Sequence, residues 1–388
     1  MTDVATKPAP GKTGGNAPPP PAPWPFPVGV YESTVQDYDV SVVQTTSAQQ
    51  LPLWNISPTG WMRGVWMDFR MAVTGQATNS VSYAGDNPFS GVQKVTLYDL
   101  GGEVVQQFTG YDWMCVNKFG AYFGIGDPRN DIQYTATTGT GSTAGSFHFN
   151  LYLPLEIVAR DALGTVQNES KPGWKIEIYI DSQALTYNQV PSVQGTMRVR
   201  GYPDSYTEPA AAAPNGRPFA KTPPLPGTLQ YWKSENNTIP AGNGKYDLTN
   251  GIGFPIRNMF YKVIDTSTPT RAVGDGDWPD PFQLLLGNVS LKNISKDVYL
   301  TKLCRDFGLI SSTPDTANAR ENGVFPQYFT KDFTKDPGSE VRMKYLDTQV
   351  NSLVRLNGSF GAANTTNVLV NWIATPSKNR YALIAGGS

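Results

Sequence analysis

Apolar and polar residues alternate along much of the chain, and this alternation predicts its strands. In the stretch 65–71, valine, methionine and phenylalanine occupy every second position, with tryptophan, aspartate and arginine between them. The stretches 147–153 and 176–180 repeat the pattern. Side chains of a strand point to opposite faces in turn, so each stretch predicts a strand with one buried face and one wetter face.

Turn-forming residues separate these strands. The segments 86–88, 101–102 and 171–173 combine glycine, proline, asparagine, aspartate and lysine between alternating stretches. Such clusters favour turns over regular structure. No convincing long helical period interrupts the strands between residues 35 and 202. This part of the chain therefore predicts an antiparallel β-sandwich or barrel.

The second half of the chain continues in the same style. Alternating stretches at 259–264, 341–345 and 368–372 predict further strands, and 380–384 predicts a short last one. One segment differs, because its apolar residues recur at helical rather than strand spacing. It lies at about 295–307.

This single predicted helix has a start signal and an apolar stripe. Ser295 can cap its first turn, where Asp297 suits the positive end of the helix dipole. From Leu300 to Phe307, apolar residues recur at i, i+3, i+4 and i+7. Cys304 belongs to that stripe, so we interpret it as a packing residue.

Proline content divides the chain. Residues 203–227 combine many prolines with a run of alanines and predict a stiff linker. The linker separates residues 28–202 from residues 228–388. Each of these two tandem β-domains is long enough for an eight-stranded sandwich. Residues 1–27 predict a Pro-rich N-terminal arm.

Two large aromatic residues interrupt the prolines of the arm. Trp24 and Phe26 alternate with Pro23, Pro25 and Pro27. This spacing excludes helix and sheet and favours polyproline II. Large aromatics on such a tail suggest that it docks onto something. The sequence leaves three surfaces open: the chain's own first domain, a neighbouring subunit and a membrane.

Composition narrows the chemistry. Charged residues make up 16% of the chain and the formal net charge is −1. A nucleic-acid-binding protein needs a clustered basic surface, so no specific nucleic-acid partner is expected. One histidine and two cysteines are too few for a histidine-based metal site, a triad or a disulfide framework. We therefore predict no catalytic residue, no cofactor and no enzyme activity.

Two features of the sequence could still hold a site. Asp275, Asp277 and Asp280 are the densest carboxylates and could ligate calcium. Their spacing lacks the central glycine and terminal glutamate of an EF-hand loop, so we predict a solvated loop and no metal site. His148 lies on the polar phase of a strand, which favours a solvated or interface histidine over a catalytic one.

Polar positions on strands define two rival functions. Asp68, Glu177 and Asp181 are the strand carboxylates that a glycoside hydrolase would need as a facing pair. Trp66 and Tyr179 are aromatics that could stack on sugar rings in a lectin-like module. A solvated strand face is the simpler interpretation of the carboxylates, and packing in the core or at a subunit interface is the simpler one of the aromatics.

The order of several segments resembles a known family. They are 64–74 with 92–99, Gly110-Tyr-Asp-Trp, 147–155 with 175–180, 259–265, the helix ending Cys304-Arg-Asp-Phe, 325–329 and 341–346. In this order the chain resembles the double jelly-roll major capsid proteins of tailless, membrane-containing phages of the tectivirus type. The arm departs from that type, because it is rich in proline.

The resemblance implies an all-β fold of two tandem eight-stranded jelly-roll β-barrels, with one short helix in the second. It implies a major capsid protein that forms homotrimers, whose six barrels make pseudo-hexameric capsomers of an icosahedral virion shell assembled in the host cytoplasm. Minor capsid and vertex proteins would be partners. The arm, through Trp24 and Phe26, would contact the internal viral membrane or a neighbouring subunit. The alternative function is a carbohydrate- or receptor-binding β protein, such as a phage spike.

Overall fold

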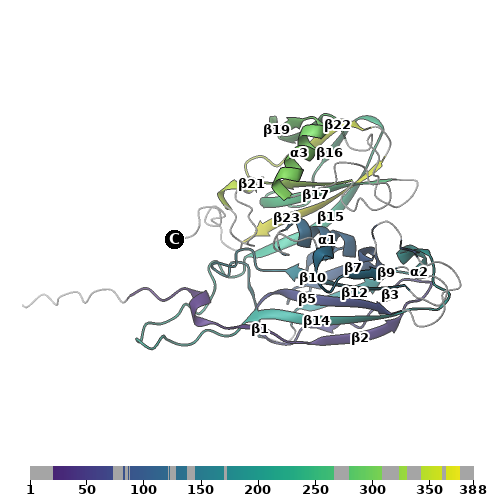
Figure 1. The fold of residues 1–388 in the computed structure, drawn as a ribbon. Coiled ribbons are helices and arrows are strands. Elements are labelled where there is room, and N and C mark those ends of the chain that lie inside the picture. Colours follow the sequence, from purple (N-terminus) through teal and green to yellow (C-terminus); the bar gives the residue numbers. More distant parts are fainter. Residues whose placement is uncertain are drawn as a thin grey trace, which may run out of the picture.

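A computed structural model shows two β-rich halves that lie side by side (Figure 1). It describes residues 21–72, 82–83, 86, 88–120, 122, 128–137, 145–169, 173–265, 279–307, 323–329, 342–360 and 364–375. The first half, in purple to teal, ends with β14, and the second, in teal to yellow, begins with β15. The predicted last strand at 380–384 lies outside the described residues.

The first half is a sandwich of two sheets. One is a seven-stranded sheet that contains, in spatial order, β1 (Glu32–Thr34) with β2 (Tyr38–Val43), β14 (Thr196–Tyr206), β5 (Gly60–Ala72) with β11 (Val166–Asn168), β10 (Ser146–Pro154) and β9 (Thr135–Thr137). The opposing strands are β8 (Val104–Phe108), β7 (Val92–Tyr98), β12 (Lys175–Ile180) and β3 (Gln49–Gln50) with β4 (Trp54–Asn55). A small two-stranded sheet pairs β6 (Ser82–Tyr83) with β13 (Tyr187–Gln189).

The second half repeats this arrangement. Its first sheet runs β20 (Val324–Tyr328), β17 (Pro255–Asp265) with β21 (Leu346–Asp347), β23 (Asn364–Ala374) and β15 (Leu229–Ile239). Its other sheet has four strands, β16 (Gly242–Asp247), β22 (Val354–Phe360), β18 (Phe282–Leu286) and β19 (Val289–Ile294).

Strand order identifies each half as a jelly roll. With β1 and β2 taken as one broken strand, and β3 and β4 as another, the first sheet of each half orders its strands first, eighth, third and sixth. The second sheet orders them second, seventh, fourth and fifth. Jelly rolls have eight strands wound into two Greek keys. The predicted all-β fold of two tandem jelly rolls is confirmed, and we call the halves the first and second jelly roll.

A continuous sheet joins the two jelly rolls. β15 of the second pairs in parallel with β8 of the first, with Trp232 opposite Gln106 and Lys233 opposite Gln107. Together with their neighbours they form a ten-stranded sheet that runs through both halves. Parallel strands need a long connection, and here α1, β9 to β14 and the linker all lie between β8 and β15 in the chain.

The boundary between β14 and the linker differs from the prediction. β14 continues past residue 202 and ends at Tyr206. Pro203 lies within it opposite Val65, and the register shifts between Asp204 and Ser205. Proline has no amide hydrogen for the ladder, and such residues are found where a bulge interrupts regular pairing. The prediction, which relied on proline content, therefore ended β14 too early.

Each jelly roll carries a helix after its fifth strand. α1 (Gly110–Phe119) follows β8, and α3 (Lys296–Phe307) follows β19. α3 confirms the predicted helix, although the side chains of Leu300 and Cys304 lie outside the described ones. α1 corrects the prediction of a single short helix in the second jelly roll. A short α2 (Gln183–Thr186) and the 3-10 helices η1 (Phe26–Gly29), η2 (Phe89–Gly91), η3 (Pro128–Asn130) and η4 (Arg342–Lys344) complete the described elements.

α1 escaped sequence analysis because it is buried on nearly all sides. Its residues Tyr111, Trp113 and Val116 are each at most 4% exposed. A helix with apolar contacts all round shows no amphipathic stripe. It packs between the two jelly rolls, where Phe119 meets Phe260 of β17 with ring centroids 5.8 Å apart.

Of the predicted strand at 341–345, the described residues 342–345 form a turn, and strand pairing begins only at β21. Residues Arg342–Lys344 form η4, and the neighbouring Tyr345 is buried in a small cluster with Ile157 and Ile373. Arg342 reaches Asp161 of the first jelly roll at 3.6 Å. These residues contact the first jelly roll instead of pairing in a ladder. A short alternating stretch is compatible with both a paired strand and a packed turn.

Candidate functional site

The root of the arm is held by the linker. The backbone amide of Trp24 donates to the carbonyl of Pro218 at 2.9 Å, and the amide of Ala220 donates to the carbonyl of Trp24 at 2.8 Å. Trp24 and Phe219 thus form a parallel β-bridge. Two proline-rich segments, distant in sequence, bind one another where neither could form a regular sheet alone.

Arg217 of the linker adds side-chain contacts to this bridge. Its guanidinium lies 4.0 Å from the centre of the Trp24 ring, and its Nε donates to the carbonyl of Ala22 at 2.6 Å. A guanidinium over an indole face contributes about 0.5–1 kcal/mol at an exposed site. Arg217 therefore fixes both the ring and the backbone of the arm at this point.

Phe26 is buried in the first jelly roll. It is 2% exposed and presents edge contacts to Trp61 and Tyr206, with centroids 5.6 and 6.0 Å apart. Gly29, at the end of η1, lies so close to Phe219 that an added Cβ would come within 2.7 Å of its ring. Trp24 and Phe26 thus contact their own chain, and contact with a membrane or a neighbouring subunit stays a prediction.

We expect Phe26→Ala to release the arm root without unfolding the jelly roll. Removing a buried phenylalanine costs about 3–5 kcal/mol, and a terminal segment can open locally by that amount. Cleavage of residues 21–31 by thermolysin should become about 100-fold faster, which corresponds to about 3 kcal/mol. Tyr31→Ala is the control, because Tyr31 is 80% exposed. Equal cleavage of the two variants would contradict the anchoring role.

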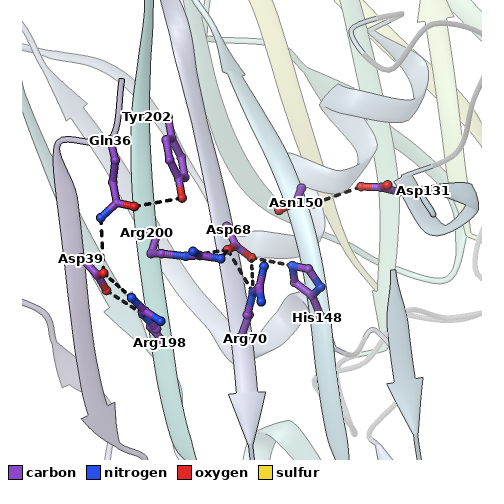
Figure 2. A network of polar contacts seen from close by, with 10 residues as sticks. All are labelled: Gln36, Asp39, Asp68, Arg70, Asp131, His148, Asn150, Arg198, Arg200 and Tyr202. Carbon is purple, nitrogen blue, oxygen red and sulfur yellow. Dashed lines mark hydrogen bonds and ion pairs between the residues drawn. The ribbon is translucent and has the colours of Figure 1, made fainter. Parts of the chain in front are cut away.

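A network of charged side chains covers the outer face of β14, β5 and β10 (Figure 2). Asp68 lies at its centre and is 6% exposed. Its carboxylate accepts from Arg200, with Nε at 2.8 Å, from Arg70 Nε at 3.1 Å, and meets His148 Nε2 at 2.6 Å. Register explains the cluster, because Arg200 lies opposite Asp68, and Arg70 lies opposite His148.

A second pair extends this network to β2. Arg198 binds Asp39 with two bonds, Nε to Oδ1 at 2.8 Å and Nη2 to Oδ2 at 2.5 Å. The hydrogen bond from Arg198 holds the pKa of Asp39 below its usual range. Gln36 then connects Asp39 to Tyr202 (Figure 2). Since these groups satisfy one another, the face is an ordered charged surface.

The single histidine has a partner within the chain. The strand pattern predicted a solvated or interface histidine. The side chain of His148 is 13% exposed and contacts Asp68. Oppositely charged side chains on neighbouring strands pair across a sheet face, and such a partner cannot be read from the alternation of one strand. A role for His148 at an interface stays a prediction.

The structure does not bring the predicted carboxylates together. Asp68 and Glu177 lie on the outer faces of opposing sheets. Glu177 accepts from Gln50 at 2.7 Å and from Tyr98 at 2.9 Å. Asp181 lies four positions beyond Glu177, about 13 Å along an extended chain. An inverting glycosidase needs carboxyl groups about 6.5–9.5 Å apart, and a retaining one about 5 Å.

The two aromatics considered for sugar stacking are occupied within the chain. Trp66 lies against Tyr152 with centroids 4.8 Å apart. Lys94 Nζ lies 4.7 Å above the ring of Tyr179. Each ring therefore already has one contact within the chain, and the use of either as a sugar platform stays a prediction.

The acidic loop at 275–280 is described only at its end. Asp275 and Asp277 lie outside the described residues. Asp280 accepts from the backbone amide of Lys296 at 3.2 Å, at the first turn of α3, where a carboxylate suits the helix dipole. In the part of the chain that the structure describes, no group of acidic, histidine and cysteine residues could hold a metal ion.

One buried ion pair was not foreseen from the sequence. Lys262 of β17 pairs with Asp112 of α1, and their side chains are 6% and 1% exposed. Thr109 and Asp112 form a capping box at the start of α1. That Thr-x-x-Asp spacing is the signal that could have revealed both the helix and its buried carboxylate.

A polar hub accompanies this ion pair between the jelly rolls. Gln230 of β15 donates to the carbonyls of Leu155 and Glu156 at 3.1 and 3.0 Å. Its Oε1 accepts from Trp232 at 3.2 Å and from Tyr122 at 3.1 Å. Buried polar groups held this way fix two surfaces in one relative position.

Comparison with known proteins bears on the fold. No family model matches the sequence. No curated protein matches it. Several solved structures match at probability 1.00 over most of the chain.

Three of these matches are capsid structures. The major capsid protein of Sulfolobus turreted icosahedral virus has a TM-score of 0.57, 12% identity, and coverage of 91% of this chain and 99% of that chain. For VP54 of PBCV-1 the values are 0.54, 12%, 90% and 97%. For the major capsid protein P2 from bacteriophage PM2 they are 0.50, 12%, 90% and 99%. The chain therefore has the double jelly-roll fold. Its particular form of that fold is the one seen in double jelly-roll major capsid proteins.

Proposed function

We propose that this protein is the major capsid protein of an icosahedral virus. The observation that carries the proposal is the match of both jelly rolls, over at least 90% of this chain, to major capsid proteins. Fold alone does not define function, so the proposal also needs support from the chain's own contacts. The continuous sheet and the buried contacts between the jelly rolls make a rigid block, as a building unit of a shell requires.

We propose that the assembled unit is a homotrimer with a pseudo-hexameric outline. Two jelly rolls of the same strand order lie in each chain, so three chains would supply six similar blocks around one axis. Closed cyclic symmetry is the rule for soluble oligomers. From the resemblance in element order we also propose that the virus is a tailless phage with an internal membrane. Its shell would assemble in the host cytoplasm.

Native mass spectrometry of the purified chain tests the trimer. We expect a species of three chains that persists at micromolar concentration, with six-fold-looking projections in negative-stain images. A stable monomer at that concentration would exclude the capsomer. Virion gels separate the alternative function, because a capsid protein should be the dominant band and a receptor-binding spike a minor one.

We propose that the arm ahead of Trp24 contacts a neighbouring capsomer or the internal membrane, while Trp24 and Phe26 hold its root. Within the described residues no helix is long and apolar enough to cross a bilayer. In this proposal, residues that precede the root make the membrane contact.

Deletion of residues 1–20 tests the arm. We expect trimers to form normally and closed shells to fail, because the deletion keeps the bond from Trp24 to Pro218 and the buried side chain of Phe26. A variant with the same 20 positions replaced by Gly/Ser repeats controls for length. Flotation with vesicles distinguishes a membrane contact from a subunit contact. Normal shells from the truncated chain would refute the assembly role.

A further inference from the structure

A shallow cavity lies on the outer face of the four-stranded sheet of the second jelly roll. Its volume is about 530 Å³, within the range of about 300–1,000 Å³ that is usual for ligand pockets. β16, β22 and β18 form its floor. The side chains of its lining that bear on a ligand are Asn243, Lys245, Pro281, Gln283, Asn357 and Ser359.

Register places the polar side chains of this cavity in two rows. Asn357 of β22 lies opposite both Lys245 of β16 and Gln283 of β18. Asn243 and Ser359 lie opposite each other in the next row. Directly opposed residues in an antiparallel sheet point to the same face. The cavity is therefore lined by amide, hydroxyl and ammonium groups from three adjacent strands.

These side chains differ from those on the outer faces of the first jelly roll. Within the described residues, no hydrogen bond to another side chain or to the backbone engages the side chains of Gln283, Asn357 or Ser359. By contrast, Asp68 and Glu177 of the first jelly roll are each bound by several neighbours. The hydrogen-bonding groups of these three side chains are therefore not used within the described part of the chain and stay open to solvent or to a ligand.

The chemistry of the lining selects the kind of partner. An amide offers both donors and acceptors, and a hydroxyl offers one donor and two lone pairs. Sugar hydroxyl groups are likewise donors and acceptors at once. Pro281 supplies an apolar surface for the C–H face of a ring. Lys245 is the one charged residue of the lining, and the adjacent Asp247 and Arg355 neutralise each other with a bond of 2.8 Å.

Other partner classes fit this cavity less well. A protein interface gains most of its affinity from a buried apolar or aromatic centre, which this lining does not offer. A nucleic acid requires a surplus of positive charge, and here a single lysine faces the cavity. A neutral, polyhydroxylated ligand matches both the hydrogen-bonding groups and the charge.

We propose that this cavity, lined by Asn243, Gln283, Asn357 and Ser359, is a binding site for a neutral oligosaccharide. The site gives the protein a glycan-binding activity in addition to the proposed capsid role, and it does not rest on that role. Asn357 holds the central position, because its side chain lies between those of Lys245 and Gln283.

Saturation-transfer NMR on the full chain tests the proposal, with chitotriose, maltotriose and lactose as probes. We expect saturable binding of at least one of them. Asn357→Ala and Gln283→Ala should each weaken that binding by about fivefold to tenfold, as the loss of a hydrogen-bonding partner does. Asn237→Ala is the matched control, because Asn237 is exposed on β15 of the same jelly roll and lies outside the cavity.

Each outcome decides the matter. Binding that is lost in the Asn357→Ala and Gln283→Ala double variant, with an unchanged melting temperature and circular dichroism spectrum, supports the site. Binding that survives in the double variant places the sugar elsewhere and overturns the proposal. The absence of saturable binding for all three probes overturns it too.

Discussion

Replacing Lys262 with methionine is expected to lower the free energy of unfolding by about 3–5 kcal/mol, the usual cost of breaking a buried ion pair from one side. The side chain of Asp112 is 1% exposed and sits between the jelly rolls. Without Lys262 its carboxylate would remain in a site of low polarity with no cation to compensate its charge. The loss therefore exceeds that of a typical core substitution of similar volume.

Urea unfolding followed by tryptophan fluorescence measures this change. The double variant Lys262→Met and Asp112→Asn should recover most of the loss, because the uncompensated charge is gone and asparagine can still cap α1. Lys94→Met is the surface control, since Lys94 lies 3.9 Å from Glu177 and its side chain is 38% exposed. Exposed pairs contribute about 0–1 kcal/mol. Equal losses in Lys94→Met and Lys262→Met would show that the pair at the junction is effectively solvated.

The strands of this chain could be predicted because their signal is local. In β5, β10 and β12 every second residue meets the core, so the period of two is written directly in the sequence. The order of such segments was enough for the double jelly roll. α3 was equally visible, with Ser295 and Asp297 marking its start.

The same local reasoning failed for a sheet that is covered on both of its faces. Lys262 shares one phase of β17 with Phe260, while Tyr261 belongs to the other phase, which packs in the core of the second jelly roll. The sheet that contains β17 has its own jelly-roll core on one face and α1 on the other, so Lys262 is 5% exposed. An alternating stretch predicts a strand, but it does not show whether a second domain covers the face that points away from the strand's own core.

Contacts between distant segments could not be predicted from the sequence for a different reason. Asp68 meets His148 and Arg200 only because of strand register, and register depends on turns and bulges far from these residues. The arm root is similar, because Trp24 pairs with Phe219 inside two proline-rich segments that carry no periodic signal. Sequence analysis could identify Trp24 and Phe26 as unusual but could not say what they touch.

Replacing Trp232 with alanine tests whether the two jelly rolls unfold as one unit, and its expected effect on stability is large. Trp232 is 0% exposed on β15 of the second jelly roll, yet it belongs to the core cluster of the first. Its ring lies 5.6 Å from that of Phe260. Truncating such a residue costs about 3–5 kcal/mol. Because the ten-stranded sheet runs through both halves, we expect that loss to fall on a single transition shared by both jelly rolls.

Differential scanning calorimetry distinguishes shared from separate unfolding. One transition, with calorimetric and van't Hoff enthalpies in agreement, is expected for both the original chain and Trp232→Ala. Trp372→Ala is the matched comparison, since Trp372 lies only in the core cluster of the second jelly roll. Both variants should move the same transition downward. Two resolved transitions, of which Trp372→Ala moves only one, would show that the jelly rolls unfold independently and that the seam between β8 and β15 does not couple them.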